Sequence, residues 1–296
     1  MTPHTHPLVS VVIPSYNHGG YLGRALQSVL DQTYTHWEAF VIDNHSTDNT
    51  DEVLSRFPDP RIKVLKIHNN GVIAASRNMG IRAANGAWVA FLDSDDWWTA
   101  DKLQICLSEV HEQADLVYHS LEIITDRSSL CRNRLIKSWQ VKTPVLVDLL
   151  ARGNALATSS VMVKTSLLQQ LHGLNERPDM AGAEDYNTWL RVAQKSERFR
   201  YVNRRLGYYQ LHPKGNSSGR DMSIPARHAV ADFLGFLCKK QRNKLEANLK
   251  YTSGRHQYLS NNFAQAKNDL TFSMHHGKLA LKPKVLFMLS IIWLAR

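Results

Sequence analysis

Apolar and polar residues alternate in blocks over the first 120 residues, and the blocks have two different periods. Short runs such as Val9–Ile13 and Trp37–Ile42 are almost wholly apolar, which is typical of buried strands. Between these two runs, apolar residues recur at the spacing of one helix face: Leu22, Ala25, Leu26, Val29 and Leu30. The pattern therefore predicts strand, helix and strand in succession.

The same alternation continues to about residue 120. It predicts further strands at Ile62–Ile67, Trp88–Leu92 and Asp115–His119. Helices are expected over Asp51–Arg56, over Val72–Ala84 and around Leu103. Strands and helices that alternate with short connections predict an α/β fold with a parallel, doubly wound sheet and helices on both faces.

The pattern changes in the second half of the chain. Residues 121–145 are expected to form a polar, irregular loop, followed by a helix over Val145–Arg152 and a strand over Ser159–Val163. A helix over Glu184–Lys195 and two short strands, Phe199–Val202 and Gly207–Leu211, come next. From about Ser223 the chain shows only helix signals. We therefore expect a first domain over residues 1–220 and a helical extension over residues 221–296.

Composition and charge narrow the class of protein. The three cysteines are far apart in the 296 residues, which argues against a disulfide framework or a zinc site and favours a reducing compartment. There is no signal-peptide pattern and no apolar run of about 18 residues, so we expect a cytoplasmic chain without a membrane-spanning helix. Half of the 36 Lys and Arg residues but only 4 of the 26 Asp and Glu residues lie beyond residue 197. This basic end predicts an anionic partner, such as a membrane surface, nucleic acid or an acidic polymer.

The most informative chemistry lies in Phe91-Leu92-Asp93-Ser94-Asp95-Asp96. A predicted buried strand ends here in three carboxylates within four residues, and such carboxylates repel one another unless a cation lies among them. Ligands of open α/β sheets bind at this end of the strands. The segment predicts a Mg²⁺ or Mn²⁺ site. The alternative is a polar turn whose aspartates cap the next helix.

Four other polar segments follow predicted strands or open a predicted helix. Tyr16, in Pro14-Ser15-Tyr16-Asn17, could stack on a base, and Asp43-Asn44 could accept hydrogen bonds from a base or ribose. Arg77 could pair with a phosphate, and Glu184-Asp185 could supply a general base. Each of these has an ordinary structural explanation, as a turn residue, a surface ion pair or a helix start. The usual glycine-rich nucleotide motifs are absent, so a nucleotide would be held differently.

Taken together and in this order, the segments resemble family 2 glycosyltransferases, which are inverting enzymes of the GT-A fold. The resemblance runs from about Val9 to about Ser218. It rests on Val9–Asn17, on Phe40–Asp48 and on Asn70–Gly80, which has Ser76 where alanine is usual. The Gln-x-x-Arg-Trp element of processive synthases is absent after Asp185, which favours transfer of a single sugar.

The resemblance implies a role for each segment. The nucleotide sugar would contact Pro14, Tyr16, Asp43, Arg77, Asp93 and Ser94. Asp95, Asp93 and the late His212, which is followed by Asn216-Ser217-Ser218, would hold Mn²⁺ or Mg²⁺. Asp185 would be the catalytic base, with Glu184 beside it. We expect the acceptor side to include Trp98, Asn154 and Thr158.

The expected function is transfer of a sugar from a UDP- or dTDP-sugar to a hydroxyl of a glycan or lipid-linked acceptor in cell-surface polysaccharide synthesis. The ten-residue apolar run Val285–Leu294 follows two lysines, which predicts either a packed final helix or peripheral attachment to the inner face of a membrane. The alternatives are a sugar-nucleotide nucleotidyltransferase and a non-enzymatic protein that binds nucleic acid or an anionic surface. Because no nucleic-acid-binding motif accompanies the basic end, nucleic acid is not the expected partner.

Overall fold

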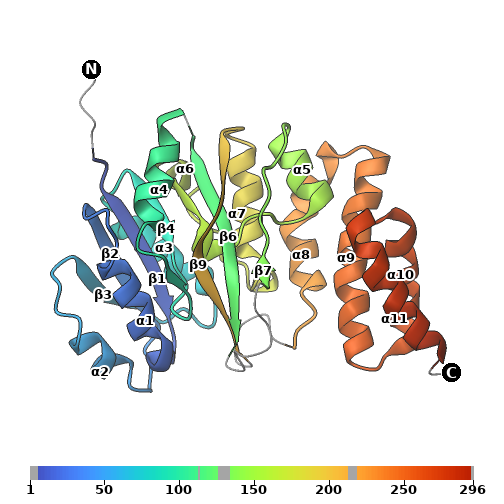
Figure 1. The fold of residues 1–296 in the computed structure, drawn as a ribbon, viewed down its shortest axis with the longest axis horizontal. Helices are drawn as coiled ribbons and strands as arrows, with labels where there is room; N and C mark the ends of the chain where they lie inside the picture. Colours follow the sequence, from blue (N-terminus) through green and yellow to red (C-terminus); the bar gives the residue numbers. More distant parts are fainter. Residues whose placement is uncertain (1–5, 113, 126–133, 213–218, 295–296) are drawn as a thin grey trace. The chain divides into compact units, whose positions relative to one another are not determined.

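The computed structural model describes residues 6–112, 114–125, 134–212 and 219–294 (Figure 1). The chain forms two compact units. The sheet unit comprises Met1–Val141, Ala155–Glu176 and Arg191–His212, and the helical unit comprises Lys142–Asn154, Arg177–Leu190 and Pro213–Arg296. The helical unit therefore combines the C-terminal helices with two segments from within residues 1–220.

One mixed sheet runs through the sheet unit in the order β3-β2-β1-β4-β8-β6-β9-β5, with β7 paired to β6. The strands β3, β2, β1 and β4 are parallel, and β8 is antiparallel to both of its neighbours, β4 and β6. As a result β4 and β6 run in the same direction, and β9 is parallel to β6. The strands are β1 Val9–Ser15, β2 Trp37–Asp43, β3 Ile62–Lys66, β4 Trp88–Phe91, β5 Trp97–Trp98, β6 Leu116–Thr125, β7 Leu135–Ile136, β8 Met162–Lys164 and β9 Phe199–Leu211.

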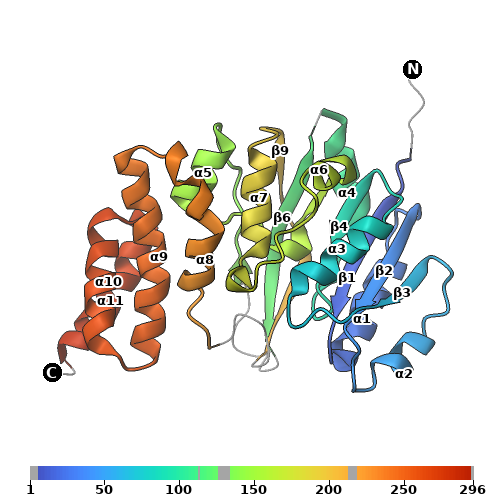
Figure 2. The same ribbon diagram turned by 180° about the vertical axis from the view of Figure 1, so that it is seen from behind.

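Helices cover both faces of this sheet, as an α/β chain requires. On one face α1 (Gly19–Leu30) and α4 (Lys102–Ser108) share an apolar cluster with alternate residues of β1. On the other face lies α3 (Ile73–Ala83), and α6 (Thr165–Gln170) packs on α3 (Figure 2). A Cβ at Gly80 of α3 would lie 2.6 Å from Cγ1 of Val12, so the glycine allows α3 to approach β1 closely. The short α2 (Thr50–Ser55) packs against α1.

The alternating pattern up to residue 119 and the mostly parallel sheet with helices on both faces are confirmed. Three local predictions were wrong. Residues 121–125, expected in a loop, continue β6 because they pair with β9. The two strands expected over Phe199–Val202 and Gly207–Leu211 are one strand. Its pairing with β6 shifts register part-way along, so the residues between the two expected strands remain in the strand. Residues Thr158–Ser160 form a 3-10 turn, and the strand begins only at Met162.

The helical unit is built around a long helical hairpin. Helix α9 (Lys239–Leu259) pairs with α10 (Phe263–His276), and α10 packs on α11 (Lys282–Leu294), in agreement with the helix signals of this region (Figure 1). The buried Asp269 of α10 accepts a hydrogen bond from Lys250 of α9 at 2.9 Å. The unit also contains α5 (Val145–Arg152), most of α7 (Glu184–Ala193) and α8 (Ser223–Val230).

Helices long and apolar enough to cross a bilayer do not occur in the part of the chain that the structure describes.

Candidate active site

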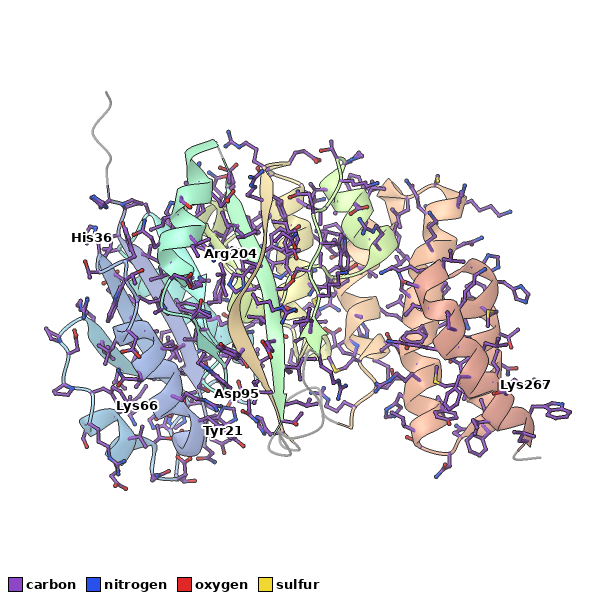
Figure 3. All side chains as sticks on the ribbon, in the orientation of Figure 1. Tyr21, His36, Lys66, Asp95, Arg204 and Lys267 are labelled. Carbon is purple, nitrogen blue, oxygen red and sulfur yellow. The ribbon has the colours of Figure 1, made fainter. Side chains whose placement is uncertain are left out.

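Several of the predicted site residues gather at one edge of the sheet. The strands β1, β2, β4 and β9 all end at this edge, because they run in the same direction. Asp95 and Tyr21 lie at this edge, whereas His36, which precedes β2, lies at the opposite one (Figure 3). The polar segments expected to bind a ligand therefore follow neighbouring strands, as ligand sites of α/β sheets do.

A carboxylate and two imidazoles form the centre of the site. Nε2 of His212, just after β9, lies 2.9 Å from Oδ2 of Asp95, which follows β4. His18 directly precedes α1, and one ligand atom each from His18, Asp95 and His212 lie within 4.8 Å of one another. The ring of Tyr21 stacks on His212 at 4.8 Å, which fixes the orientation of the imidazole. These three side chains offer donors of the kind that divalent metals accept.

Asp93 and Ser94 link this centre to neighbouring elements. Nη2 of Arg77 donates to Oδ1 of Asp93 at 2.7 Å, and the Arg77 side chain is only 3% exposed. Oγ of Ser94 lies 2.8 Å from Nδ1 of His18. The pairing fixes one cationic side chain from α3 beside the carboxylates that follow β4.

Asp95 and Asp96, adjacent in sequence, have opposite environments. The side chain of Asp96 is buried, and its Oδ1 accepts a hydrogen bond from the backbone of Gln210 at 3.0 Å. Burial, and then the charges of Asp95 and Asp93, raise the pKa of the Asp96 carboxyl well above its ordinary value. Asp95 is partly exposed and lies beside the histidines. The structure therefore separates a buried carboxyl from a carboxylate that can reach a ligand.

The loops after β1 and β2 are tied together next to this centre. Oδ1 of Asn17 accepts a hydrogen bond from the backbone of Thr47, and the backbone of Asn17 donates to Oγ of Ser46. Pro14 is buried in β1, whereas the Tyr16 ring is 54% exposed. Tyr16 is therefore accessible for stacking on a base.

Asp43, at the end of β2, is fully buried and already has partners. Its carboxylate accepts hydrogen bonds from Ser46 and from Nζ of Lys66, the latter at 2.8 Å. The hydrogen bonds to Asp43 and then to Asp51 raise the pKa of Lys66. A base that bonds to Asp43 would have to share or displace these contacts.

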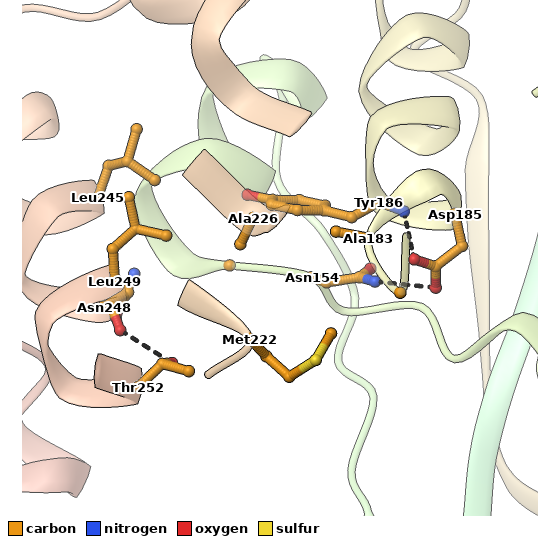
Figure 4. Close-up of a pocket in the computed structure, with 12 residues that line it drawn as sticks. Asn154, Ala183, Asp185, Tyr186, Met222, Ala226, Leu245, Asn248, Leu249 and Thr252 are labelled. Atoms are coloured by element: carbon orange, nitrogen blue, oxygen red, sulfur yellow. Dashed lines mark hydrogen bonds between the residues drawn. The ribbon is translucent and has the colours of Figure 1, made fainter. Parts of the chain in front are cut away.

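The predicted catalytic pair and Asn154 belong to the helical unit. Oδ2 of Asp185 accepts a long hydrogen bond of 3.4 Å from Nδ2 of Asn154, and Oδ1 accepts one from the backbone of Tyr186 (Figure 4). Glu184 is buried, and its carboxylate accepts a hydrogen bond from the backbone of Gly182 at 2.6 Å. Burial, and secondarily the charge of Asp185, raise the pKa of the Tyr186 hydroxyl. Of the two acids, Asp185 is the accessible one, and it lines a cavity.

The two other predicted acceptor residues lie in the sheet unit. Trp98 is 3% exposed, belongs to the core cluster and donates from Nε1 to the carbonyl of Ser159 at 2.7 Å. This position gives its predicted acceptor role no support. Thr158, in the 3-10 turn, is partly exposed. The motif residues Asn216, Ser217 and Ser218 lie outside the described residues.

Sequence reasoning missed His18 and Tyr21. Both lie directly after the Pro14–Asn17 segment, which was expected to bind the nucleotide, so their proximity to that segment was the available signal. Neither has a motif of its own, and only the fold brings them to His212, which lies almost 200 residues further along the chain.

Comparisons with known proteins identify the family of this chain. Residues 10–160 match the sequence model of the family described as Glycosyl transferase family 2. The chain is 31% identical over 216 residues, 72% of its length and 83% of the relative's, to the "Putative teichuronic acid biosynthesis glycosyltransferase TuaG" of Bacillus subtilis (strain 168). It is also 31% identical over 186 residues, 62% of its length and 69% of the relative's, to the UDP-Glc:alpha-D-GlcNAc-diphosphoundecaprenol beta-1,3-glucosyltransferase WfgD of Escherichia coli.

Solved structures share the fold at low sequence identity. S. aureus TarS 1-349 in complex with UDP-GlcNAc has a TM-score of 0.68 at 18% identity, covering 95% of this chain and 86% of that one. The mannosyltransferase PcManGT from Pyrobaculum calidifontis in complex with GDP-Man and Mn²⁺ has a TM-score of 0.64 at 18% identity, covering 98% and 81%. The chain therefore belongs to glycosyl transferase family 2 and has the GT-A fold.

Proposed function

We propose that this family 2 glycosyltransferase inverts the anomeric centre while it moves one sugar from a UDP- or dTDP-sugar to a hydroxyl of a glycan or lipid-linked acceptor. The cluster of His18, Asp95 and His212 beside the Arg77–Asp93 pair carries the proposal, because it provides ligands and charge for a diphosphate. The relatives support the pathway, since TuaG is named for teichuronic acid biosynthesis and WfgD for a diphosphoundecaprenol acceptor. The product would enter a cell-surface polysaccharide.

In the proposed reaction, the acceptor hydroxyl attacks the anomeric carbon of the donor. A carbon–oxygen bond forms there, the bond from that carbon to the diphosphate breaks, and the nucleoside diphosphate leaves with the electron pair. The Asp185 carboxylate takes the hydroxyl proton. Attack from the face opposite the leaving group inverts the anomeric centre.

The remaining site residues would hold the donor. Tyr16 would stack on the base, and the loop containing Asp43 would bond to it. Arg77, kept in place by Asp93, would face the diphosphate and oppose its negative charge.

The residues fit a divalent metal cofactor. Asp95 and His212 would hold it, with His18 as a third ligand, and it would neutralise charge on the diphosphate. Two imidazoles and one carboxylate suit Mn²⁺ better than Mg²⁺, which prefers oxygen ligands alone.

Calorimetry tests the donor site. We expect UDP or dTDP to bind in the presence of Mn²⁺, and the affinity to fall about tenfold or more in Asp95→Ala. Asp101→Asn, at the start of α4, is the matched control, since Asp101 is not among the site residues. A folded protein that binds none of UDP, dTDP and GDP, with or without Mn²⁺, would contradict the donor-site assignment.

A turnover assay tests the catalytic base. Asp185→Asn should reduce transfer by about 100-fold or more, because general-base catalysis contributes about that much, and nucleotide affinity should stay the same. Transfer at the wild-type rate would refute the assignment of Asp185.

We further propose that α11 attaches the enzyme to an anionic membrane surface, where a lipid-linked acceptor would be met. The side chains of Leu286, Phe287, Trp293 and Leu294 are between 62% and 74% exposed. Lys282 and Lys284 precede them at the start of α11, and no acidic residue occurs between Asp269 and these side chains. Exposed apolar side chains together with uncompensated positive charge are the features of an interfacial helix.

Vesicle flotation tests this attachment. The protein should float with phosphatidylglycerol-containing vesicles and not with neutral ones, and the double variant Phe287→Ser/Trp293→Ser should stay at the bottom of the gradient. Ile224→Ser, an exposed apolar position on α8, is the matched control. Equal flotation of the double variant and the wild type would count against α11.

A further inference from the structure

We infer that a cavity inside the helical unit binds one acceptor sugar, and that its apolar wall selects a sugar carrying a methyl group, as in an acetamido or a 6-deoxy sugar. The inference deepens the proposed function, since it rests on Asp185 as the catalytic base. The sequence offered only Asn154 as an acceptor residue in this unit.

The cavity has a volume of about 270 Å³ and lies wholly within the helical unit (Figure 4). Segments that are far apart in the sequence contribute to it: the end of α5, the start of α7, α8 and the middle of α9. This volume is close to the lower end of the range for small-ligand sites, which is about 300 Å³. The space therefore suits one sugar ring and not a longer glycan.

One wall of the cavity is apolar. Leu245 and Leu249 come from α9, Met222 precedes α8, and Ala226 lies on α8 (Figure 4). The hydroxyls of an unsubstituted hexose would lose hydrogen bonds to water against this wall. A methyl group would instead bury apolar surface there, which is favourable.

The opposite side of the cavity is polar. Asp185 and Asn154 lie there, joined by the hydrogen bond of 3.4 Å. Asn248 and Thr252 lie on α9, on the same side as Leu249 (Figure 4). Nδ2 of Asn248 donates to the carbonyl of Ala151 at 3.0 Å, and the Thr252 hydroxyl donates to the backbone carbonyl of Asn248 at 3.2 Å, so these groups already have partners within the protein. A sugar in the cavity would thus meet the proposed base at a hydroxyl and the apolar wall at its methyl group.

Two features distinguish this cavity from a packing defect. A packing defect is closed and lined by apolar groups, whereas this cavity contains a carboxylate, two amides and a hydroxyl. The carboxylate is also the group to which the family motif assigns proton transfer.

The test measures acceptor binding apart from catalysis. Saturation-transfer NMR on the full chain would compare methyl glycosides of glucose, N-acetylglucosamine and a 6-deoxyhexose, with no donor present. We expect binding of one or both methyl-bearing sugars to exceed that of glucose by about tenfold, the scale of discrimination that a hydrophobic pocket gives for a single carbon.

Ala226→Leu fills the cavity without removing any contact, and should abolish that binding. Ala231→Leu, the same change at an exposed position soon after α8, is the matched control. Leu249→Ala, which enlarges the cavity on its apolar side, should reduce the preference for a methyl group. The unfolding temperature of each variant verifies that it is folded.

Hydrolysis of the donor in the absence of acceptor measures donor cleavage separately from acceptor binding. Loss of acceptor binding in Ala226→Leu supports the inference if Ala231→Leu keeps both acceptor binding and donor hydrolysis. Equal binding of all three glycosides, or a preference that Ala226→Leu leaves intact, overturns it. If the wild type hydrolyses and transfers no donor sugar, the proposed function fails, while the NMR comparison still decides whether the cavity binds these sugars.

Discussion

Replacing Lys102 by methionine should stabilise the protein, because the lysine buries an ammonium group that receives little compensation. Lys102 is the first residue of α4, and its side chain is completely buried. Its Nζ has no hydrogen-bond partner among the described residues and lies 3.9 Å from the centre of the Trp98 ring. A positive charge at the start of a helix also opposes the helix dipole.

The cost of this burial follows from the pKa. Burial lowers the pKa of Lys102 from its ordinary 10.5 to about 8. That difference corresponds to about 3 kcal/mol of folding free energy at pH 7, where the group is charged in both the folded and the unfolded chain. The contact with Trp98 returns about 1 kcal/mol. Methionine has a similar unbranched shape and no charge, so Lys102→Met should gain about 2 kcal/mol.

Urea denaturation of the wild type and of Lys102→Met at pH 7 and pH 9 provides the assay. The folded pKa is lowered, so the penalty is fully present below about pH 8 and is lost as the pH rises toward 10.5. The advantage of the variant should therefore shrink by about 1 kcal/mol between the two pH values. A destabilised variant, or an advantage independent of pH, would refute the reasoning. Lys239→Met, an exposed lysine at the first position of α9, controls for loss of a positive charge at a helix start.

Three other outcomes follow from the contacts described above. Gly80→Ala should lower the free energy of unfolding by about 1–3 kcal/mol, measured by urea denaturation, because the added Cβ would meet Val12 at 2.6 Å. Asp269→Asn should cost about 1–3 kcal/mol at neutral pH. Burial raises the pKa of Asp269, but hydrogen bonds, led by the one from Lys250, lower it overall. The stability difference between wild type and variant should therefore disappear as the pH falls through the folded pKa of Asp269. A loss of stability that persists in acid would contradict this account. Tyr16→Ala should weaken nucleotide binding about tenfold in calorimetry, since base stacking is worth about 1–3 kcal/mol, while unchanged affinity would exclude stacking.

The part of the fold that the sequence predicted depends on local signals. Apolar runs such as Val9–Ile13 and the helix spacing after Leu22 determine the parallel half of the sheet almost by themselves. The position of β8 between β4 and β6 has no such signal. The apolar pattern of a three-residue strand is too short to indicate which strands lie beside it in the sheet. The length of β6 was missed for the same reason: its last residues are strand only because β9 pairs with them.

Some features of the candidate site could be predicted from local sequence motifs, and others depend on the fold. Asp95 and His212 could be named because each belongs to a motif, whereas His18 has no motif and depends on the start of α1 for its position. The sequence could not separate the partly exposed Asp95 from the buried Asp96, because the burial of Asp96 depends on β9. The cavity around Asp185 was also out of reach, since α9 lines it from about 60 residues further along the chain.

The helical unit is built from three separate chain segments, so it can form only after the last of them has been synthesised. The hydrogen bond from Asn248 to Ala151 joins residues that are 97 positions apart. At the usual rate of translation, about 5–20 s separate the emergence of the two partners from the ribosome. Leu149 and Leu150 of α5 are fully buried in the folded protein. During this interval α5 lacks its packing against α9. Until α9 has been synthesised, the nascent chain therefore carries apolar side chains of α5 that lack part of their final packing.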